Sequence, residues 1–103
     1  MAAPTIIRAR LAGELTSVRV LMAHEMESGQ RKDTAGRTVP TWFIQEVRVT
    51  HNGRPVLQLQ FGPSVSKDPY LQFMLRGARA GDRIGVAWVD NRGERRSDEA
   101  VVV

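Results

Sequence analysis

The chain contains no cysteine among its 103 residues. No disulfide can therefore stabilise the fold, and no thiol is available as a nucleophile, a carrier or a metal ligand. Aromatic residues make up only 6% of the sequence, too few to indicate a stacking surface for nucleic-acid bases. No apolar run approaches the roughly 20 residues that a transmembrane helix needs. We therefore expect neither thiol chemistry nor a membrane partner.

Charge gives a first indication of the kind of partner. Basic residues outnumber acidic residues by 15 to 11, for a formal net charge of +4. Such a balance can indicate nucleic-acid binding, but most basic residues have acidic neighbours, as in residues 94–99. We expect no nucleic-acid partner and interpret the charge as solubility or as a docking surface for an acidic protein. The length and the hydrophobic content of 42% fit one domain, residues 1–103.

Hydrophobic residues recur at every second position, which is the period of a β-strand. Seven segments show this pattern: residues 5–11, 15–22, 41–50, 56–61, 70–76, 84–88 and 95–103. Asn52-Gly53 between two of them is a strong hairpin signal, because both residues accept positive φ. Seven strands and no convincing helix predict an all-β fold, an immunoglobulin-like antiparallel β-sandwich with Trp88 on an inner face. A small barrel is the structural alternative.

The third predicted strand has two unlike faces. Glu46 and Arg48 share one of them. Counting back in steps of two places Ile44 and Trp42 on that same face. Part of the face is therefore expected to be covered, either within the domain or by another chain.

The longest connection, residues 22–40, is the first place to look for function. Met22, His24 and Met26 alternate in it, so they share a face if the segment is extended, and two thioethers with an imidazole suit Cu(I). A periplasmic copper-binding β-sandwich is therefore one hypothesis. In the other interpretation, Met22 packs in the core while His24 and Met26 line the loop or a partner surface.

Catalytic chemistry has little support in the residues. Glu25 and Glu27 could pair with His24 as carboxylate and base. No serine or threonine is clearly placed to be activated by them, and no phosphate-binding motif is present. We expect a binding module and not an enzyme, with no cofactor and no metal.

One run also resembles a known family. Residues 24–32, His-Glu-Met-Glu-Ser-Gly-Gln-Arg-Lys, are similar to the segment His-Pro-Met-Glu-Thr-Gly-Gln-Arg-Lys of the SoxZ family, with Glu25 in place of proline and Ser28 in place of threonine. The similarity continues along nearly the whole chain, through Asn52-Gly53, Asp68-Pro69-Tyr70-Leu71, Phe73, Trp88 and Asp90. The resemblance implies a non-catalytic subunit of the SoxYZ sulfur carrier complex of thiosulfate oxidation. In that complex a cysteine near the C-terminus of SoxY carries the sulfur intermediates.

The resemblance further implies the partners and the compartment. SoxY would be bound in a heterodimer, other Sox enzymes would be contacted transiently, and the isolated chain could form a homodimer. The family works in the periplasm, whereas the first residues lack the basic start and apolar stretch of a signal peptide. The expectation is therefore co-export with a signal-bearing partner. The expected contacts are the loop residues His24, Glu25, Met26, Glu27, Gly29, Gln30 and Arg31, with Trp42 and Ile44 as apolar anchors.

Overall fold

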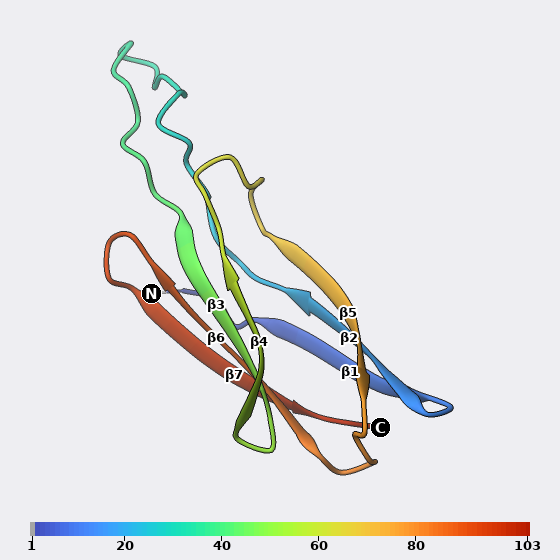
Figure 1. The fold of residues 1–103 in the computed structure, drawn as a ribbon. Helices are drawn as coiled ribbons and strands as arrows, with labels where there is room; N and C mark the ends of the chain where they lie inside the picture. Colours follow the sequence, from blue (N-terminus) through green and yellow to red (C-terminus); the bar gives the residue numbers. More distant parts are fainter. Residues whose placement is uncertain (1) are drawn as a thin grey trace.

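Seven antiparallel strands form two facing sheets in the computed structural model, which describes residues 2–103 (Figure 1). The strands are β1 (Ile6–Ala12), β2 (Leu15–Leu21), β3 (Ile44–His51), β4 (Arg54–Gln60), β5 (Tyr70–Arg76), β6 (Arg83–Asp90) and β7 (Arg95–Val101). Their order is β1-β2-β5 in one sheet and β4-β3-β6-β7 in the other. The predicted all-β, immunoglobulin-like sandwich is confirmed. Met1, which belongs to the predicted domain 1–103, lies outside the described residues.

The core lies between the sheets, where alternate residues of each strand meet. Val18 and Val20 of β2 are fully buried, as are Val47 and Val49 of β3. Trp88 of β6 is 3% exposed, so its predicted place on an inner face is confirmed. Burial of each such side chain contributes about 1.5–3 kcal/mol to folding. No helix able to cross a membrane occurs in residues 2–103.

The predicted hairpin at Asn52-Gly53 joins β3 to β4. Asn52 has φ of 51° and Gly53 has φ of 82°, the backbone that this pair of residues tolerates best. Asn52 also reaches the neighbouring strand β6. Its N–H donates to the carbonyl of Arg83 at 2.8 Å, and its Oδ1 accepts the N–H of Arg83 at 2.8 Å. The turn is therefore fixed to the sheet as well as closed on itself.

A β-bulge at the start of β3 overturns one sequence expectation. Ile44 pairs with Asp90, but Glu46 pairs with Val89, so Gln45 is one residue extra against β6. The extra residue reverses the alternation of side chains. Ile44 therefore points into the core, with 0% exposure, and not to the face of Glu46 as predicted. The assignment of Ile44 to the face of Glu46 was wrong because a period of two assumes an unbroken ladder, whereas the expected cover over Ile44 is supplied within the domain.

The two lateral sides of the sandwich differ. On one side the C-terminus meets β1. There the N–H of Leu11 donates to the carbonyl of Val103 at 2.8 Å, and the N–H of Val103 donates to the carbonyl of Ala9 at 3.0 Å. On the other side β4 and β5 are edge strands, and no Cα atom of one lies within 8 Å of the other. The C-terminal residues thus link the two sheets along one side only.

The molecule is elongated for its length. Its radius of gyration is 15.4 Å and its extents are 53 × 21 × 20 Å, whereas a domain of about 100 residues typically has a radius near 13 Å. The connection between β2 and β3 accounts for the difference, because it projects well beyond the ends of the sheets (Figure 1).

Candidate functional site

The connection between β2 and β3 forms an arm, defined as residues 22–43. Its two segments run in opposite directions and pair at isolated bridges, Glu27 with Trp42 and Lys32 with Thr38. At the first bridge each backbone N–H donates to the carbonyl of the other residue, at N···O distances of 2.6 and 2.9 Å. The arm is therefore an irregular hairpin, joined across its two segments by these bridges and by the N–H of Val39, which donates to the carbonyl of Arg31 at 2.8 Å.

The tip of the arm is closed by the carboxylate of Asp33. Its Oδ1 accepts hydrogen bonds from the N–H groups of Ala35 at 2.9 Å and Arg37 at 3.0 Å, as aspartate side chains commonly do in turns. Gly36 between them has φ of 79°, which glycine adopts without strain. All of residues 30–38 are exposed. This outer part of the arm is free to contact another molecule.

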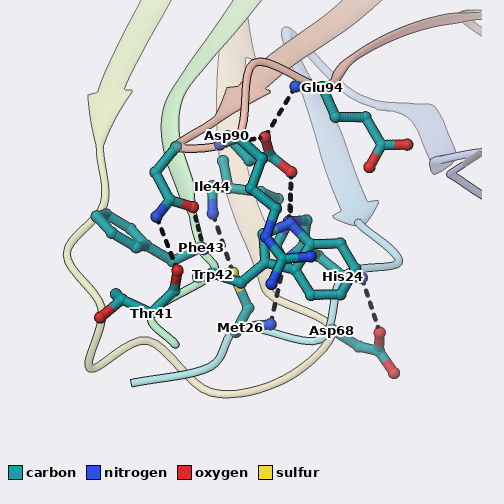
Figure 2. A network of polar contacts seen from close by, with 11 residues as sticks. His24, Met26, Thr41, Trp42, Phe43, Ile44, Asp68, Asp90 and Glu94 are labelled. Carbon is teal, nitrogen blue, oxygen red and sulfur yellow. Dashed lines mark hydrogen bonds and ion pairs between the residues drawn. The ribbon is translucent and has the colours of Figure 1, made fainter. Parts of the chain in front are cut away.

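The base of the arm is built around one buried carboxylate, that of Asp90 at the end of β6. Its Oδ2 lies 3.0 Å from Nε2 of His24 and accepts a hydrogen bond from Nε1 of Trp42 at 2.8 Å (Figure 2). Its Oδ1 accepts the backbone N–H groups of Arg92 and Glu94, each at 2.9 Å. Asp90 therefore joins both segments of the arm to the turn between β6 and β7.

The pKa of Asp90 is lowered, although the largest single influence on it acts in the other direction. Burial disfavours the charged form and would raise the pKa. The hydrogen bonds from His24, from Trp42 and from two backbone N–H groups together outweigh burial. Asp90 is thus an anion at neutral pH, and hydrogen bonds to a charged group are stronger than those between neutral groups.

Both ring nitrogens of His24 are engaged. Nδ1 accepts the backbone N–H of Met26 at 3.0 Å, so the neutral ring carries its proton on Nε2 and donates it to Asp90. An imidazole oriented by a carboxylate is the arrangement of a general base. Here, however, the nitrogen that would accept a proton faces a backbone N–H, and His24 is only 7% exposed. The pair joins the arm to the end of β6, and the side chains of His24 and Asp90 are 2% and 0% exposed.

Met26 is similarly committed. It has φ of 53°, which is uncommon for a residue with a side chain, and its Sδ accepts the N–H of Ile44 at 3.3 Å. The side chains predicted for Cu(I) are all buried, with Met22 at 0% and Met26 at 6% exposure. This geometry does not favour the copper hypothesis. Within residues 2–103, no group of three or more His, Cys, Asp or Glu side chains is placed to hold a metal ion.

Trp42 packs against His24 at the base of the arm. Its ring meets that of His24 edge-on, with centroids 4.9 Å apart, and Trp88 from the core meets the same imidazole at 5.3 Å. The guanidinium carbon of Arg92 lies 4.2 Å from the Trp42 ring centroid, within the range of a cation–π contact. Trp42 is half-buried, so it links the core to the surface at the base of the arm.

An ion pair and a glycine set the shape of the arm just above its base. Nε of Arg31 donates to both carboxylate oxygens of Glu27, at 3.0 and 3.1 Å, and its Nη2 donates to Oε2. The hydrogen bond from Arg31 lowers the pKa of Glu27. Gly29 has φ of 84°, and a Cβ there would lie 2.7 Å from Oγ1 of Thr41. The two segments therefore approach too closely here for a larger residue.

The loop before β5 also braces the base. Oδ1 of Asp68 accepts the N–H of His24 at 3.0 Å, and the N–H of Asp68 donates to the carbonyl of His24 at 2.9 Å. The N–H of Met22 donates to the carbonyl of Pro69 at 2.9 Å. His24 is thus held through its backbone as well as through its ring.

The nine predicted contact residues fall into three groups by exposure. Three are buried: His24, Met26 and Ile44. Three are half-buried: Glu27, Gly29 and Trp42. Three are exposed: Glu25, Gln30 and Arg31. The buried side chains belong to the base and the core, so in this conformation they act on a partner only by fixing the others in place.

Sequence reasoning missed Asp90 and Asn91 as residues of the base. Asp90-Asn91-Arg92-Gly93 indicates a turn, and Oδ1 of Asp90 does bind N–H groups of that turn. Asn91 clamps the other end of the arm, because its Oδ1 accepts the N–H of Phe43 and its Nδ2 donates to the carbonyl of Thr41, both at 2.9 Å. No local signal indicates these contacts, since the partners lie 48 or more residues away.

The fold and the base of the arm together define an immunoglobulin-like β-sandwich that presents a braced arm. In proteins of this class, loops on a rigid scaffold carry the function. The family model for the sulphur oxidation protein SoxZ matches residues 6–101, which include all seven strands and the arm. The chain therefore belongs to the SoxZ family, and its role lies in sulfur oxidation. No curated protein matches the chain.

Proposed function

We propose that this chain is the non-catalytic subunit of a SoxYZ carrier complex, in which SoxY carries the sulfur intermediates of thiosulfate oxidation on a cysteine near its C-terminus. Membership of the SoxZ family supports this role. The chain has no cysteine, so covalently carried sulfur requires a thiol on another subunit. Its best-oriented histidine, His24, is buried and bound at both ring nitrogens, which suits a scaffold better than a catalyst.

The arm is the proposed contact with SoxY, and its braced base is the observation that carries the proposal. Gln30 and Arg31 are exposed on it, and the Glu27–Arg31 ion pair orients the guanidinium. Because the arm is already ordered, binding through it costs less conformational entropy than ordering a flexible loop. Arginine and tryptophan commonly dominate interface energies, so Arg31 and Trp42 are the expected anchors.

Calorimetric titration of the purified chain with SoxY tests this assignment. Arg31→Ala and Trp42→Ala should each weaken binding by about tenfold, as expected for interface anchors. Arg54→Ala is the matched control, because Arg54 is exposed beside the β3–β4 turn at the opposite end of the molecule (Figure 1). Unchanged affinity in both arm variants would show that SoxY binds elsewhere.

The proposed compartment is the periplasm, reached by co-export with SoxY. The resemblance to the SoxZ family implies this compartment, and a chain that folds into a braced sandwich could bind its partner before export. The chain should appear in the periplasmic fraction when co-expressed with SoxY, and remain in the cytoplasm when the signal segment of SoxY is deleted. Periplasmic chain in cells that lack SoxY would contradict co-export.

Two weaker associations complete the proposal. Transient contacts with other Sox enzymes would bring them to the carried sulfur. In the absence of SoxY, the same arm surface would allow two copies of the chain to form a homodimer. Size-exclusion chromatography over a range of concentrations should show that homodimer, and added SoxY should convert it to the heterodimer.

A further inference from the structure

The outward-facing residues of the β1-β2-β5 sheet form a continuous surface, here called the basic face, that is separate from the arm. Directly paired residues of antiparallel strands share a face, and the register places them in rows across all three strands. The rows are Ile6–Leu21–Tyr70, Arg8–Arg19–Gln72, Arg10–Ser17–Met74 and Ala12–Leu15–Arg76.

The charge on this face has one sign. β1, β2 and β5 together contain four arginines and not one aspartate or glutamate. Arg76 reaches Glu14 at 4.0 Å, but Arg8, Arg10 and Arg19 form no ion pair within residues 2–103 and are exposed. The outer face of the other sheet differs, because Glu46 and Arg48 pair there at 3.0 Å. The unbalanced charge is therefore a property of the basic face and not of the whole surface.

The arrangement of these arginines carries a cost in the free chain. Arg8 and Arg19 stand directly opposite each other on adjacent strands, and like charges in that position destabilise a sheet. A carboxylate placed between them would convert the repulsion into two charge-assisted hydrogen bonds. The arrangement is thus complementary to an anionic group that the chain itself does not supply.

Apolar side chains are also concentrated on this face. Tyr70 is 59% exposed, Ile6 and Met74 are each 50% exposed, and Leu21 is 40% exposed. Three of these four form a single row across the sheet, at the end where β2 enters the arm. Contiguous exposed apolar groups bordered by charge are typical of protein-binding surfaces.

A shallow hollow of about 560 Å³ lies beside the arginines. It is lined by Arg8, Arg10 and Arg19 together with Val101 and Val103 at the end of the chain. Arg8 and Arg10 are two residues apart on one strand, a separation of about 7 Å. Carboxylates at alternate positions of an extended polypeptide repeat at the same distance, so the spacing suits a peptide lying along β1.

We propose that the basic face docks an acidic, partly apolar polypeptide segment of another protein, with carboxylates on Arg8, Arg10 and Arg19 and apolar side chains on the row that ends at Tyr70. Charge complementarity selects this occupant. A second copy of the chain seated on the same face would set arginines against arginines, and such a like-charge juxtaposition is unfavourable in an interface. The proposal does not depend on how the arm meets SoxY.

The test uses the full chain and a short fluorescein-labelled peptide with Glu at every second position and Leu or Ser between. We expect saturable binding by fluorescence anisotropy that weakens with added salt. The variant Arg8→Glu/Arg19→Glu should lose about tenfold or more in affinity. The matched control Arg54→Glu/Arg95→Glu makes the same change in net charge at exposed positions of the other sheet and should bind like the wild type. Circular dichroism melts establish that each variant is folded.

Mapping the bound peptide decides the location. Amide chemical shifts of ¹⁵N-labelled chain should move along β1, β2 and β5 and not on the arm. The milder variant Arg8→Gln/Arg19→Gln gives an independent result if charge reversal disturbs the fold, and it should also weaken binding. Peptide affinity that is equal in the variants and the wild type would overturn the proposal. So would arginine-dependent binding to phosphatidylserine vesicles with none to the peptide, because that result would identify the face as a membrane-binding surface.

Discussion

His24 and Asp90 lie 66 residues apart in the sequence, yet Nε2 of the histidine is 3.0 Å from Oδ2 of the aspartate. The contact joins the first residues of the arm to the last residue of β6. Because Asp90 also binds Trp42 from the returning segment, one carboxylate sets the direction in which the whole arm leaves the sandwich. The stability of this contact is therefore a condition for whatever the arm binds.

Asp90→Asn should destabilise the protein by about 1.5–3 kcal/mol, the range for hydrogen bonds to a charged group. The amide keeps the shape of the carboxylate. Its NH₂ group, however, must face N–H groups that donate hydrogen bonds to the Asp90 carboxylate in the wild type. Urea unfolding measures the change. Glu99→Gln, at an exposed residue whose ion pair with Arg83 spans 4.0 Å, should leave the midpoint unchanged. An Asp90→Asn variant as stable as the wild type would show that the base of the arm does not depend on the negative charge of Asp90.

Trp88→Ala should cost about 3–5 kcal/mol, as is usual when a large aromatic side chain is removed from a core. Trp88 is 3% exposed and lies beside His24 as well as the core valines. Tyr70→Ala is the comparison, because Tyr70 is 59% exposed and its loss should change stability little. Thermal melts of the two variants measure both effects, and equal midpoints would contradict the central place given to Trp88.

Gly29→Ala should loosen the arm more than Gly36→Ala. Both glycines have positive φ, so alanine at either position is strained by roughly 1–2 kcal/mol. Only at Gly29 would the new Cβ also collide with Oγ1 of Thr41, at 2.7 Å, whereas no atom lies within 4 Å at Gly36. Hydrogen exchange at the amides of Glu27 and Trp42 reports opening of the arm directly.

A second substitution separates the collision from the backbone strain. Thr41→Ala removes Oγ1, so Gly29→Ala/Thr41→Ala should exchange more slowly than Gly29→Ala alone. If the double variant exchanges as fast as the single one, strain at Gly29 explains the whole effect and the close approach of the two segments is unimportant.

Acid should weaken the protein through Asp82 in the turn between β5 and β6. That turn lies at the end of the sandwich opposite the arm (Figure 1). Oδ2 of Asp82 lies 2.8 Å from Nε2 of His51 and accepts the N–H of Arg79 at 2.9 Å. The hydrogen bond from His51, then those from Arg79 and Asn52, lower the pKa of Asp82 from 3.8 to about 2. A carboxyl group whose pKa is lower in the folded state stabilises the protein above its unfolded pKa, and this stabilisation is lost as the pH falls through the folded pKa.

The stabilisation from Asp82 should therefore be complete above pH 3.8 and disappear as the pH falls toward about 2. Urea unfolding of the wild type and of Asp82→Asn over that range measures it. The difference in free energy of unfolding between the two proteins should narrow steadily as the pH is lowered. A difference that stays constant from pH 4 to pH 2 would show that the hydrogen bonds do not favour the charged form.

Most of the sandwich was predictable because its signals are local. The alternation of Val18 and Val20, and of Val47 and Val49, needs only a few neighbouring residues to show a strand. The Asn52-Gly53 turn is likewise set by the φ values that those two residues accept. Each strand was found within a few residues of its observed bounds, and the third began at Ile44 and not at Thr41.

The candidate site was predictable only as a place in the chain. The unusual polar run 22–40 indicated where function lies, but not which of its side chains face outward. His24 and Met26 looked like surface groups because they stand in a polar segment. In the structure both are buried. His24 lies against Trp42 and Asp90, and Met26 accepts the N–H of Ile44, partners that no short window of sequence contains.

The strand content, the turns and the absence of any thiol follow from residue type or from spacing over a few positions. The bulge at Gln45, the inward turn of Ile44 and the contact between Asp90 and His24 exist only in the folded chain. The same is true of the meeting of the β1 and β2 arginines on one face. Such features depend on register between distant strands, where a shift of one residue exchanges the two faces.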